Sequence, residues 1–436
     1  MSGARVGPVR FGRWLAAISL AGLVLRMAYA IVERDLDVSN DGGYYRFAAG
    51  ALVDGLGFVH PFSSEPFALH PPGWPVVLSL APLLGFESEL AHQLLAALVG
   101  ATSVVLVGLA GRAVAGARVG LIAALIAAVH PNLWLYERTL FSETLVVPLV
   151  AALVLVGHKH WHHPRVRTAV AVGGLSGLLA LVRSEQLLLV GVLLAPLVLL
   201  AGRSTIDLRR RLVWLALGAG TAVAALIPWF AHNAARFEEP VLVTTGLGIT
   251  LRIANCPASY GDELLGHIDE QCYYAAAPGD GSTQDVFLRG RALEFVRDNA
   301  SRVPAVVAAR LGRTWGLYRP FQQMRLDAGY ARDPLWVHRA GYITYWLVAP
   351  LAVGGAVVLR RRGVPLSTLL AFVVVVVAAT TITYGQPRFR VPAEVPLIIL
   401  AAVAIDAGLR RARRRRGEAA VGHTRAAVHA APASSP

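Results

Sequence analysis

The sequence predicts an all-α membrane protein that crosses the bilayer about ten times. Of its 436 residues, 55% are hydrophobic and only 16% are charged, whereas ordinary soluble domains carry about 25% charged residues. Apolar runs long enough to cross about 30 Å of hydrocarbon as helices recur from Trp14 to the arginine-rich C-terminal region. The basic residues fall in short clusters between these runs, and this is the positive-inside pattern of membrane proteins.

The basic clusters indicate which loops are cytoplasmic. They are Arg10 and Arg13; Arg112 and Arg118; Lys159, Arg165 and Arg167; Arg203 and Arg209 to Arg211; Arg360 to Arg362; and Arg410 to Arg416. If all of them are cytoplasmic, the chain crosses the membrane in pairs of spans between them. The expected spans are 14–31, 90–111, 117–134, 141–157, 168–182, 186–202, 212–230, 340–359, 365–384 and 391–409.

Both termini are cytoplasmic in this scheme, in a multi-pass protein of the cell membrane. The first span has a basic flank, but no small-residue cleavage site stands out after it, so we interpret it as an uncleaved anchor. The formal net charge of +14 does not indicate nucleic-acid binding, because membrane orientation and contact with anionic lipids account for such clusters.

The apolar run 72–85 does not fit the pairing. As a full crossing it would place the cluster of Arg112 and Arg118 outside. We therefore expect an interfacial or re-entrant helix there.

Two large segments, 32–89 and 231–339, are then external. We divide the chain into an N-terminal transmembrane module (1–230), an external region with interfacial helices (231–339), C-terminal transmembrane helices (340–409) and a basic cytoplasmic tail (410–436). The second external segment has amphipathic stretches near 285–299 and 303–318 that suit a membrane surface. It also contains both cysteines, Cys256 and Cys272. A disulfide is expected on an oxidising face, and two unrelated thiols are the alternative.

Carboxylates at the ends of membrane helices are candidate functional groups, because each costs about 2.5–3.5 kcal/mol at the midplane. Asp41 lies in Ser39-Asn40-Asp41-Gly42-Gly43-Tyr44-Tyr45, soon after the first span. An Asx turn that caps the following helix explains it equally well. Glu143 begins the fourth span on the same side, where a carboxylate also complements the helix dipole.

External arginines are the second group of candidates. Arg183 lies beside Glu185 in a tight external turn, which could simply be a salt-bridged hairpin tip. Arg388 and Arg390 lie at the mouth of the last span, against the positive-inside trend. Two external guanidinium groups in an apolar setting indicate an anion-binding site, and a phosphate suits their fork geometry.

Other kinds of site are not favoured. A histidine tract is present in the loop after the fourth span, but adventitious metal affinity or a solvated loop explains it better than a catalytic metal. The tract consists of His158, His160, His162 and His163. The sequence has no Walker loop, no dinucleotide fingerprint and no HExxH or GxSxG motif. A nucleotide-driven enzyme is therefore not expected.

In order along the chain, the motifs resemble the GT-C superfamily of polyprenyl-phosphate-sugar glycosyltransferases. The resemblance is strongest to glycosyltransferase family 39, which includes protein O-mannosyltransferases and the aminoarabinose transferase that modifies lipid A. The matching pieces are Asp41 with Tyr45 and Ala48-Ala49; His70-Pro71-Pro72-Gly73-Trp74-Pro75; Pro131 with Ser142-Glu143; Gly177 to Arg183; Pro228-Trp229 with His232-Asn233; Gly248, Leu251 and Asn255; and Arg388-Phe389-Arg390-Val391-Pro392. They span about residues 14–409.

The chain departs from the family pattern in three places. His232 stands where the family often has arginine, so a cation there would depend on pH. Phe389 replaces the tyrosine of the family's Arg-Tyr-Arg motif. No large soluble region follows the last span, so the resemblance does not indicate how an acceptor is recognised.

The resemblance implies a donor of lipid, phosphate and sugar, with its polyprenyl tail in the bilayer. By analogy, Asp41 would deprotonate or orient an acceptor hydroxyl. The leaving lipid phosphate needs charge stabilisation more than protonation, and the candidates for that role are His70, Arg183, Arg388 and Arg390. Tyr45 and His232 would bind substrate, and Glu143 would either support the site or bind the sugar. Some relatives use a divalent cation and others do not, so an ion near His70 and Asp41 is left open.

Three hypotheses follow. The leading one is a membrane glycosyltransferase that acts on an external lipid, polysaccharide or protein acceptor, with Asp41 as base. The alternative is a polytopic transporter or lipid flippase, but transporters place ionisable groups near the midplane of repeated halves. This sequence has no such halves, and its candidates gather on one side. A non-catalytic scaffold on the same fold is the third.

Overall fold

The computed structural model describes residues 8–34, 40–63, 65–273 and 279–429. Within these ranges the regular structure is helical throughout, apart from one isolated β-bridge between Val59 and Pro66. The prediction of an all-α membrane protein is therefore confirmed.

Each of the ten expected spans coincides with a helix or a run of helices. They are α1 (Pro8–Val32), α5 (Glu89–Ala115), α6 (Ala117–Val129) with α7 (Pro131–Arg138), α8 (Glu143–His162), α9 (Val166–Ala180), η1 to α10 (Ser184–Leu188, Val190–Leu194 and Ala195–Leu200), α11 (Leu208–Ala234), α17 (Leu335–Arg361), α18 (Ser367–Ile382) and α19 (Val391–His429).

These ten segments fall into two groups by length. In the described part of the chain, six helices are long and apolar enough to cross a membrane, and the bent pair of α6 and α7 makes a seventh. The remaining three, α9, the run 184–200 and α18, are shorter apolar helices than the roughly 20 residues of a typical crossing. The chain is thus a multi-pass membrane protein with six or seven full-length candidate spans.

The bend of 43° between α6 and α7 has a local cause. Pro131 has no N–H, so it cannot bond the carbonyl of Ala127 four residues earlier. Arg26 of α1 compensates: its guanidinium donates to the carbonyls of Ala127 (3.3 Å) and Ala128 (3.1 Å) and to Glu137 Oε1 of α7 (2.9 Å). The arginine and its carboxylate are both buried, so this pair fixes α7 against α1 inside the protein.

The run 72–85 forms two short helices, α3 (Gly73–Leu78) and α4 (Leu80–Leu83). Together they are too short to cross the hydrocarbon, which agrees with the expected interfacial or re-entrant helix. Trp74 is fully buried and donates from Nε1 to the carbonyl of Leu140 at 2.7 Å. Gly73 donates its N–H to the carbonyl of Leu181 at 2.7 Å. These contacts hold the segment against the ends of α7 and α9.

The second segment expected outside folds as a group of short helices: α12 (Gly246–Ala254), α13 (Pro257–Tyr260), α14 (Gly281–Asp298), α15 (Val303–Thr314) and α16 (Pro320–Ala331). The amphipathic stretches correspond to α14 and α15. A disulfide joins Cys256 to Cys272, which confirms the expected pairing.

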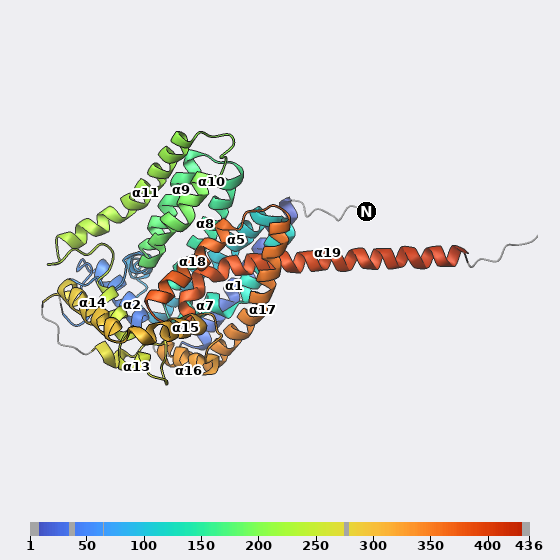
Figure 1. Ribbon diagram of the computed structural model, residues 1–436. Helices are drawn as coiled ribbons and strands as arrows, with labels where there is room; N and C mark the ends of the chain where they lie inside the picture. Colours follow the sequence, from blue (N-terminus) through green and yellow to red (C-terminus); the bar gives the residue numbers. More distant parts are fainter. Residues whose placement is uncertain (1–7, 35–39, 64, 274–278, 430–436) are drawn as a thin grey trace, which may run out of the picture.

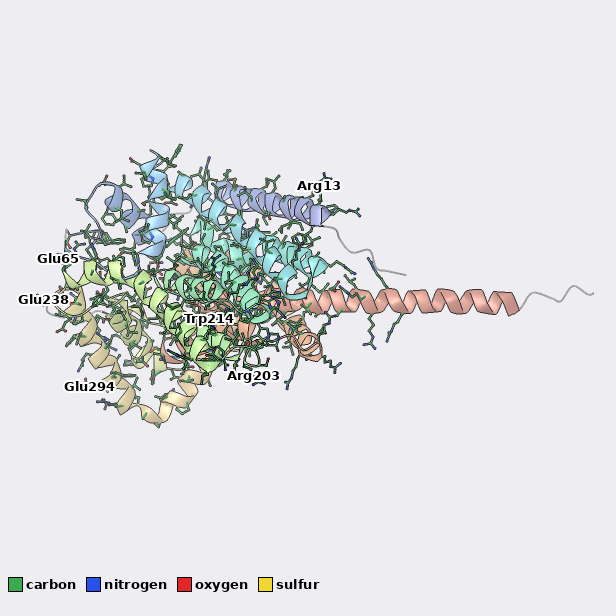
Figure 2. All side chains as sticks on the ribbon, turned by 90° about the horizontal axis from the view of Figure 1, so that it is seen from above. Arg13, Glu65, Arg203, Trp214, Glu238 and Glu294 are labelled. Atoms are coloured by element: carbon green, nitrogen blue, oxygen red, sulfur yellow. A yellow bond between two sulfur atoms is a disulfide. The ribbon has the colours of Figure 1, made fainter. Side chains whose placement is uncertain are left out.

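The molecule has two distinct ends. The short helices gather at one end with α2 (Asn40–Val53), while α19 extends from the helical body at the other (Figure 1). Figure 2 shows Glu65, Glu238 and Glu294 at the first end and Arg13 at the second. The two large segments expected outside therefore lie together.

Candidate functional site

Arg388 is the centre of an ionic cluster formed by segments far apart in the sequence. It lies in η5 (Pro387–Arg390), the short turn that leads into α19. Its Nη1 donates to Asp41 Oδ2 at 2.5 Å and its Nε donates to Glu143 Oε1 at 2.6 Å. Asp41 lies in the first turn of α2 and Glu143 begins α8. One buried guanidinium thus joins two of the carboxylates predicted as site residues.

The other oxygen of Asp41 is also engaged. His70 Nε2 and the hydroxyl of Tyr330 each lie 3.3 Å from Asp41 Oδ1. Burial opposes ionisation of this carboxyl, but Arg388 and His70 outweigh it and hold the pKa of Asp41 well below its usual range. Asp41 is therefore ionised at neutral pH and holds protons weakly.

Arg183 extends the cluster on the far side of Glu143. It donates from Nη1 to Glu143 Oε1 and from Nε to Glu185 Oε1, the latter at 2.6 Å. The hairpin-tip pair of Arg183 and Glu185 is therefore present, and it is also connected to Arg388 through Glu143. Two arginines face three carboxylates in this cluster, so it offers directed N–H donors rather than surplus positive charge.

Aromatic rings support both arginines. The guanidinium of Arg388 lies 4.1 Å from the ring centre of Phe141, and that of Arg183 lies 5.1 Å from the ring centre of Phe389. Such cation–π contacts favour a fixed guanidinium in a partly desolvated place. Phe389 thus has a clear role without the hydroxyl that the family's tyrosine would supply.

The turn between α7 and α8 positions Phe141 and the first residue of α8, Glu143, in the cluster. Leu140 in this turn has a φ of +55°, which is unusual for a residue with a side chain. Its carbonyl accepts the N–H of Trp74, so the segment that carries His70 and the turn that carries Glu143 are tied together. Tyr45 packs against the same segment, with its ring centre 5.0 Å from that of His70.

Two predicted residues do not join the cluster. Arg390 is fully buried, donates from Nε to Glu394 at 2.8 Å and lies over the ring of Tyr345. His232 stacks on Trp229 in α11, with its Nε2 3.0 Å from Arg236 Nη1. Neither side chain contacts Asp41 or Arg388 among the interactions of the described residues.

The two residues expected to hold a divalent ion contact each other instead. His70 Nε2 lies 3.3 Å from Asp41 Oδ1, and Arg388 contacts the other oxygen of the same carboxylate. No group of three or more His, Cys, Asp or Glu side chains in the described ranges is arranged to hold a metal. The histidine tract is included in this finding: His158 and His162 lie ring to ring, while His160 Nδ1 is 2.7 Å from the hydroxyl of Thr168.

Behind Arg388 lies a cavity of about 20 Å³, room for about one water molecule. Its polar lining includes Tyr330, Asp327 and His338. Asp327 accepts hydrogen bonds from the amides of Gln323 (2.8 Å) and Gln386 (3.1 Å), and burial raises its pKa. Sequence reasoning missed Tyr330 and Asp327, because no local motif marks residues of α16 as neighbours of Asp41.

Comparisons with known proteins agree with this architecture. Residues 69–232 match the family model of the dolichyl-phosphate-mannose-protein mannosyltransferases. No sequence of a curated protein matches significantly.

Among solved structures, the Archaeoglobus fulgidus oligosaccharyltransferase in its apo form matches with a TM-score of 0.52 and 16% identity. The match covers 92% of this chain and 52% of that one. The structure of the same enzyme, AglB, with an inhibitory peptide and a dolichol-phosphate has a TM-score of 0.51 and 13% identity, covering 92% and 51%. ArnT from Cupriavidus metallidurans bound to undecaprenyl phosphate has a TM-score of 0.47 and 15% identity, covering 92% and 78%.

The chain spans about half the length of the oligosaccharyltransferase that it matches. The likeness to the oligosaccharyltransferase shows a shared helical arrangement, which agrees with the fold that the resemblance implied.

Proposed function

We propose that this protein is a membrane glycosyltransferase that moves a sugar from a polyprenyl-phosphate-linked donor to an acceptor at the external face. The observation that carries the proposal is the cluster in which Arg388 joins Asp41 to Glu143. Ionic groups of this kind are costly beside a bilayer and mark functional sites. The family model over 69–232 names a lipid-phosphate-sugar donor, which supports the same substrate class.

The reaction needs one group to stabilise the leaving phosphate and another to orient the acceptor. As the bond from the anomeric carbon to the phosphate breaks, negative charge grows on the phosphate oxygens. Arg388, Arg183 and His70 present N–H groups that can bind those oxygens. Asp41 holds Arg388 and His70 in place and, in our proposal, orients the attacking hydroxyl.

The position of the charged groups favours an enzyme over a transporter. Asp41 lies in the first turn of α2, Glu143 begins α8, and Arg388 precedes α19, so all three lie at helix ends. A transporter would place such groups at broken helices near the midplane. We therefore place the donor's headgroup at the external surface and its lipid tail among the spans.

The test uses purified full-length protein in liposomes with a radiolabelled polyprenyl-phosphate sugar and acceptor extracts. Wild type is expected to transfer label covalently to an acceptor. Asp41→Asn should lower the rate by about 100-fold or more while the protein still folds and inserts. Asp262→Asn is the matched control, because that carboxylate is 95% exposed in the same external region.

Two outcomes would contradict the proposal. Movement of the labelled lipid across the bilayer without covalent transfer would identify a flippase. Full activity of Asp41→Asn would remove this residue from the mechanism, and no transfer by wild type with any acceptor extract would favour a scaffold.

A further inference from the structure

The two oxygens of Asp41 are held unequally. Oδ2 accepts from Arg388 at 2.5 Å, whereas Oδ1 has two longer contacts of 3.3 Å, one from the hydroxyl of Tyr330 and one from His70 Nε2. The side chain of Asp41 is 20% exposed, so the carboxylate is not closed off from solvent. Oδ1 is therefore the oxygen that an acceptor hydroxyl can approach, and the contacts from Tyr330 and His70 determine its direction.

The hydroxyl of Tyr330 can only donate to this carboxylate. Asp41 is ionised at neutral pH, and an ionised carboxylate accepts hydrogen bonds without donating any. Burial, followed by the negative charge of Asp41, raises the pKa of Tyr330 well above its usual value, so the hydroxyl keeps its proton. The contact is thus a directed hydrogen bond to a charged acceptor, a kind that is stronger than one between neutral groups.

The backbone of Tyr330 is fixed by two segments that are distant in sequence. Tyr330 lies in the last turn of α16, and its carbonyl accepts from Nδ2 of Asn40 at 2.6 Å. The next two carbonyls, of Ala331 and Arg332, accept from Nη2 of Arg138 at 3.2 and 3.1 Å. Arg138 belongs to α7 and is buried. Three consecutive carbonyls at the end of α16 are therefore held by α2 and α7.

The contacts of Tyr330 with the start of α2 come in a pair. Asn40 binds the carbonyl of Tyr330, and the next residue, Asp41, accepts from its hydroxyl. Asn40 has a φ of +56°, in the left-handed region that asparagine tolerates better than most residues. The ring of Tyr330 lies 6.1 Å from that of Phe141, which also lies under Arg388. One aromatic ring thus supports both Tyr330 and Arg388, which donate to opposite oxygens of Asp41.

We propose that Tyr330 is a positioning residue of the transfer reaction, an inference that rests on the function proposed above. Its hydroxyl fixes the plane of the Asp41 carboxylate, and Oδ1 then meets the acceptor hydroxyl in one orientation. In this role Tyr330 acts through Asp41 and contacts neither the sugar nor the phosphate. Orientation of this kind matters, because a misplacement of about 1 Å can lower a rate by about 100-fold.

The experiment compares wild type, Tyr330→Phe and Tyr330→Ala in the liposome transfer assay. Tyr330→Phe keeps the ring and the backbone carbonyl and removes only the hydroxyl. It should lower kcat by about 10-fold, the size expected for a hydrogen bond to a charged group. The temperature of thermal unfolding and the binding of radiolabelled polyprenyl phosphate should change little. Tyr330→Ala also loses the ring, so it should lower the unfolding temperature as well.

Tyr318→Phe is the matched control, because Tyr318 belongs to the same segment, 231–339. Its ring centre lies 5.5 Å from the guanidinium of Arg313 and 5.4 Å from that of Arg319, and phenylalanine keeps both contacts. This control should retain the wild-type kcat.

A second comparison tests whether Tyr330 acts through Asp41. In the Asp41→Asn background, Tyr330→Phe should change the remaining rate by less than about twofold, because changes that act on one and the same group are not additive. A residue that only supports the fold would lower the rate by the same factor in both backgrounds.

The outcomes separate this inference from the function on which it rests. If wild type transfers sugar and Tyr330→Phe matches it, Tyr330 is not a positioning residue although the enzyme assignment stands. An equal loss in the wild-type and Asp41→Asn backgrounds would also overturn the inference. Faster transfer by Tyr330→Phe with a lower KM for the acceptor would show that the hydroxyl occupies the acceptor's place instead. Failure of wild type itself would overturn the proposed function.

Discussion

At the scale of single residues, the site depends on guanidinium geometry rather than on charge alone. Arg388 uses separate nitrogens for Asp41 and Glu143, and its guanidinium lies over the ring of Phe141. Arg390, two residues later, points elsewhere and pairs with Glu394. A 3₁₀ turn has about three residues per turn, so side chains two apart face different directions. Only one arginine of the motif can therefore meet Asp41.

Arg388→Lys is expected to lower the transfer rate by about 10- to 100-fold and to reduce thermal stability. Lysine keeps the charge, but a single ammonium cannot reproduce both the two directed bonds and the contact of the guanidinium with the ring. Transfer assays and thermal unfolding in detergent measure both effects. The control is Arg302→Lys, because Arg302 makes an exposed ion pair with Asp262 at 3.5 Å, and such pairs contribute little. Equal losses in both variants would contradict the geometric argument.

His267 gives the folded protein an acid-sensitive group outside the membrane spans. Burial, aided by the nearby Arg313, lowers the pKa of His267 to about 4, whereas an unfolded histidine titrates near 6.5. The unfolded state therefore binds the proton more readily between these values, and stability falls as the pH decreases from about 6.5 to about 4.

His267→Gln should make the free energy of unfolding less dependent on pH in this window, by up to about 1.4 kcal/mol per pH unit. Unfolding measured at pH 7, 6 and 5 tests this, with the exposed His163 changed to glutamine as control. An unchanged slope in the His267 variant would show that the residue does not titrate as stated.

At the scale of elements, the loop before η5 decides where Arg388 lies. The N–H of Gly385 donates to the carbonyl of Gly266 at 2.8 Å, and the N–H of Gln386 donates to the hydroxyl of Thr314 at 3.2 Å. Arg310 of α15 donates to the carbonyls of Ala254 (2.7 Å) and Thr381 (3.1 Å). Contacts from α15 and from the loop that contains Gly266 thus fix the loop before η5 in place. In our proposal this loop connects the second segment expected outside to the catalytic cluster.

Gly385→Ala is expected to displace this loop. A Cβ at Gly385 would overlap the backbone carbonyl of Arg310, and backbone cannot move aside cheaply. We expect a loss of about 1–3 kcal/mol in stability and a transfer rate at least several-fold lower. Gly290→Ala in α14 is the control, since its Cβ would meet open space and alanine favours helix. Normal activity in Gly385→Ala would show that the loop is not fixed by α15.

The sequence predicted the positions of the helices far better than the contacts between distant side chains. Apolar runs and arginine clusters are local signals, and they located all ten helical segments. The pairing of Tyr330 with Asp41 joins residues 289 apart in sequence, and no local pattern encodes such a meeting. Arg390 and His232 were predicted as site residues because of their residue type and their place in the motifs. The direction of each side chain depends on helix rotation and packing, which the motifs do not encode.

At the scale of the whole molecule, two ionic clusters lie at opposite ends. Asp41, His70, Glu143, Arg183 and Arg388 meet at the end that carries the short helices α12 to α16. The long helix α19 leaves the body at the other end (Figure 1), where Asp406 pairs with Arg118 at 3.2 Å and with Arg410 at 2.6 Å. Arg118 and Arg410 belong to two different basic clusters, so their shared partner places both clusters on one side.

This arrangement predicts the topology of the chain in the membrane. Reporter fusions after Arg183 and Gly279 should give external signals, because both positions belong to the end with the ionic cluster and the short helices. Fusions after His163 and Arg203 should give cytoplasmic signals, since basic residues accumulate in those loops. A reporter pair with complementary activity on the two sides makes each position a positive measurement. A cytoplasmic signal at either Arg183 or Gly279 would contradict this orientation, and the residues of the two segments expected outside could then not contribute to one donor site.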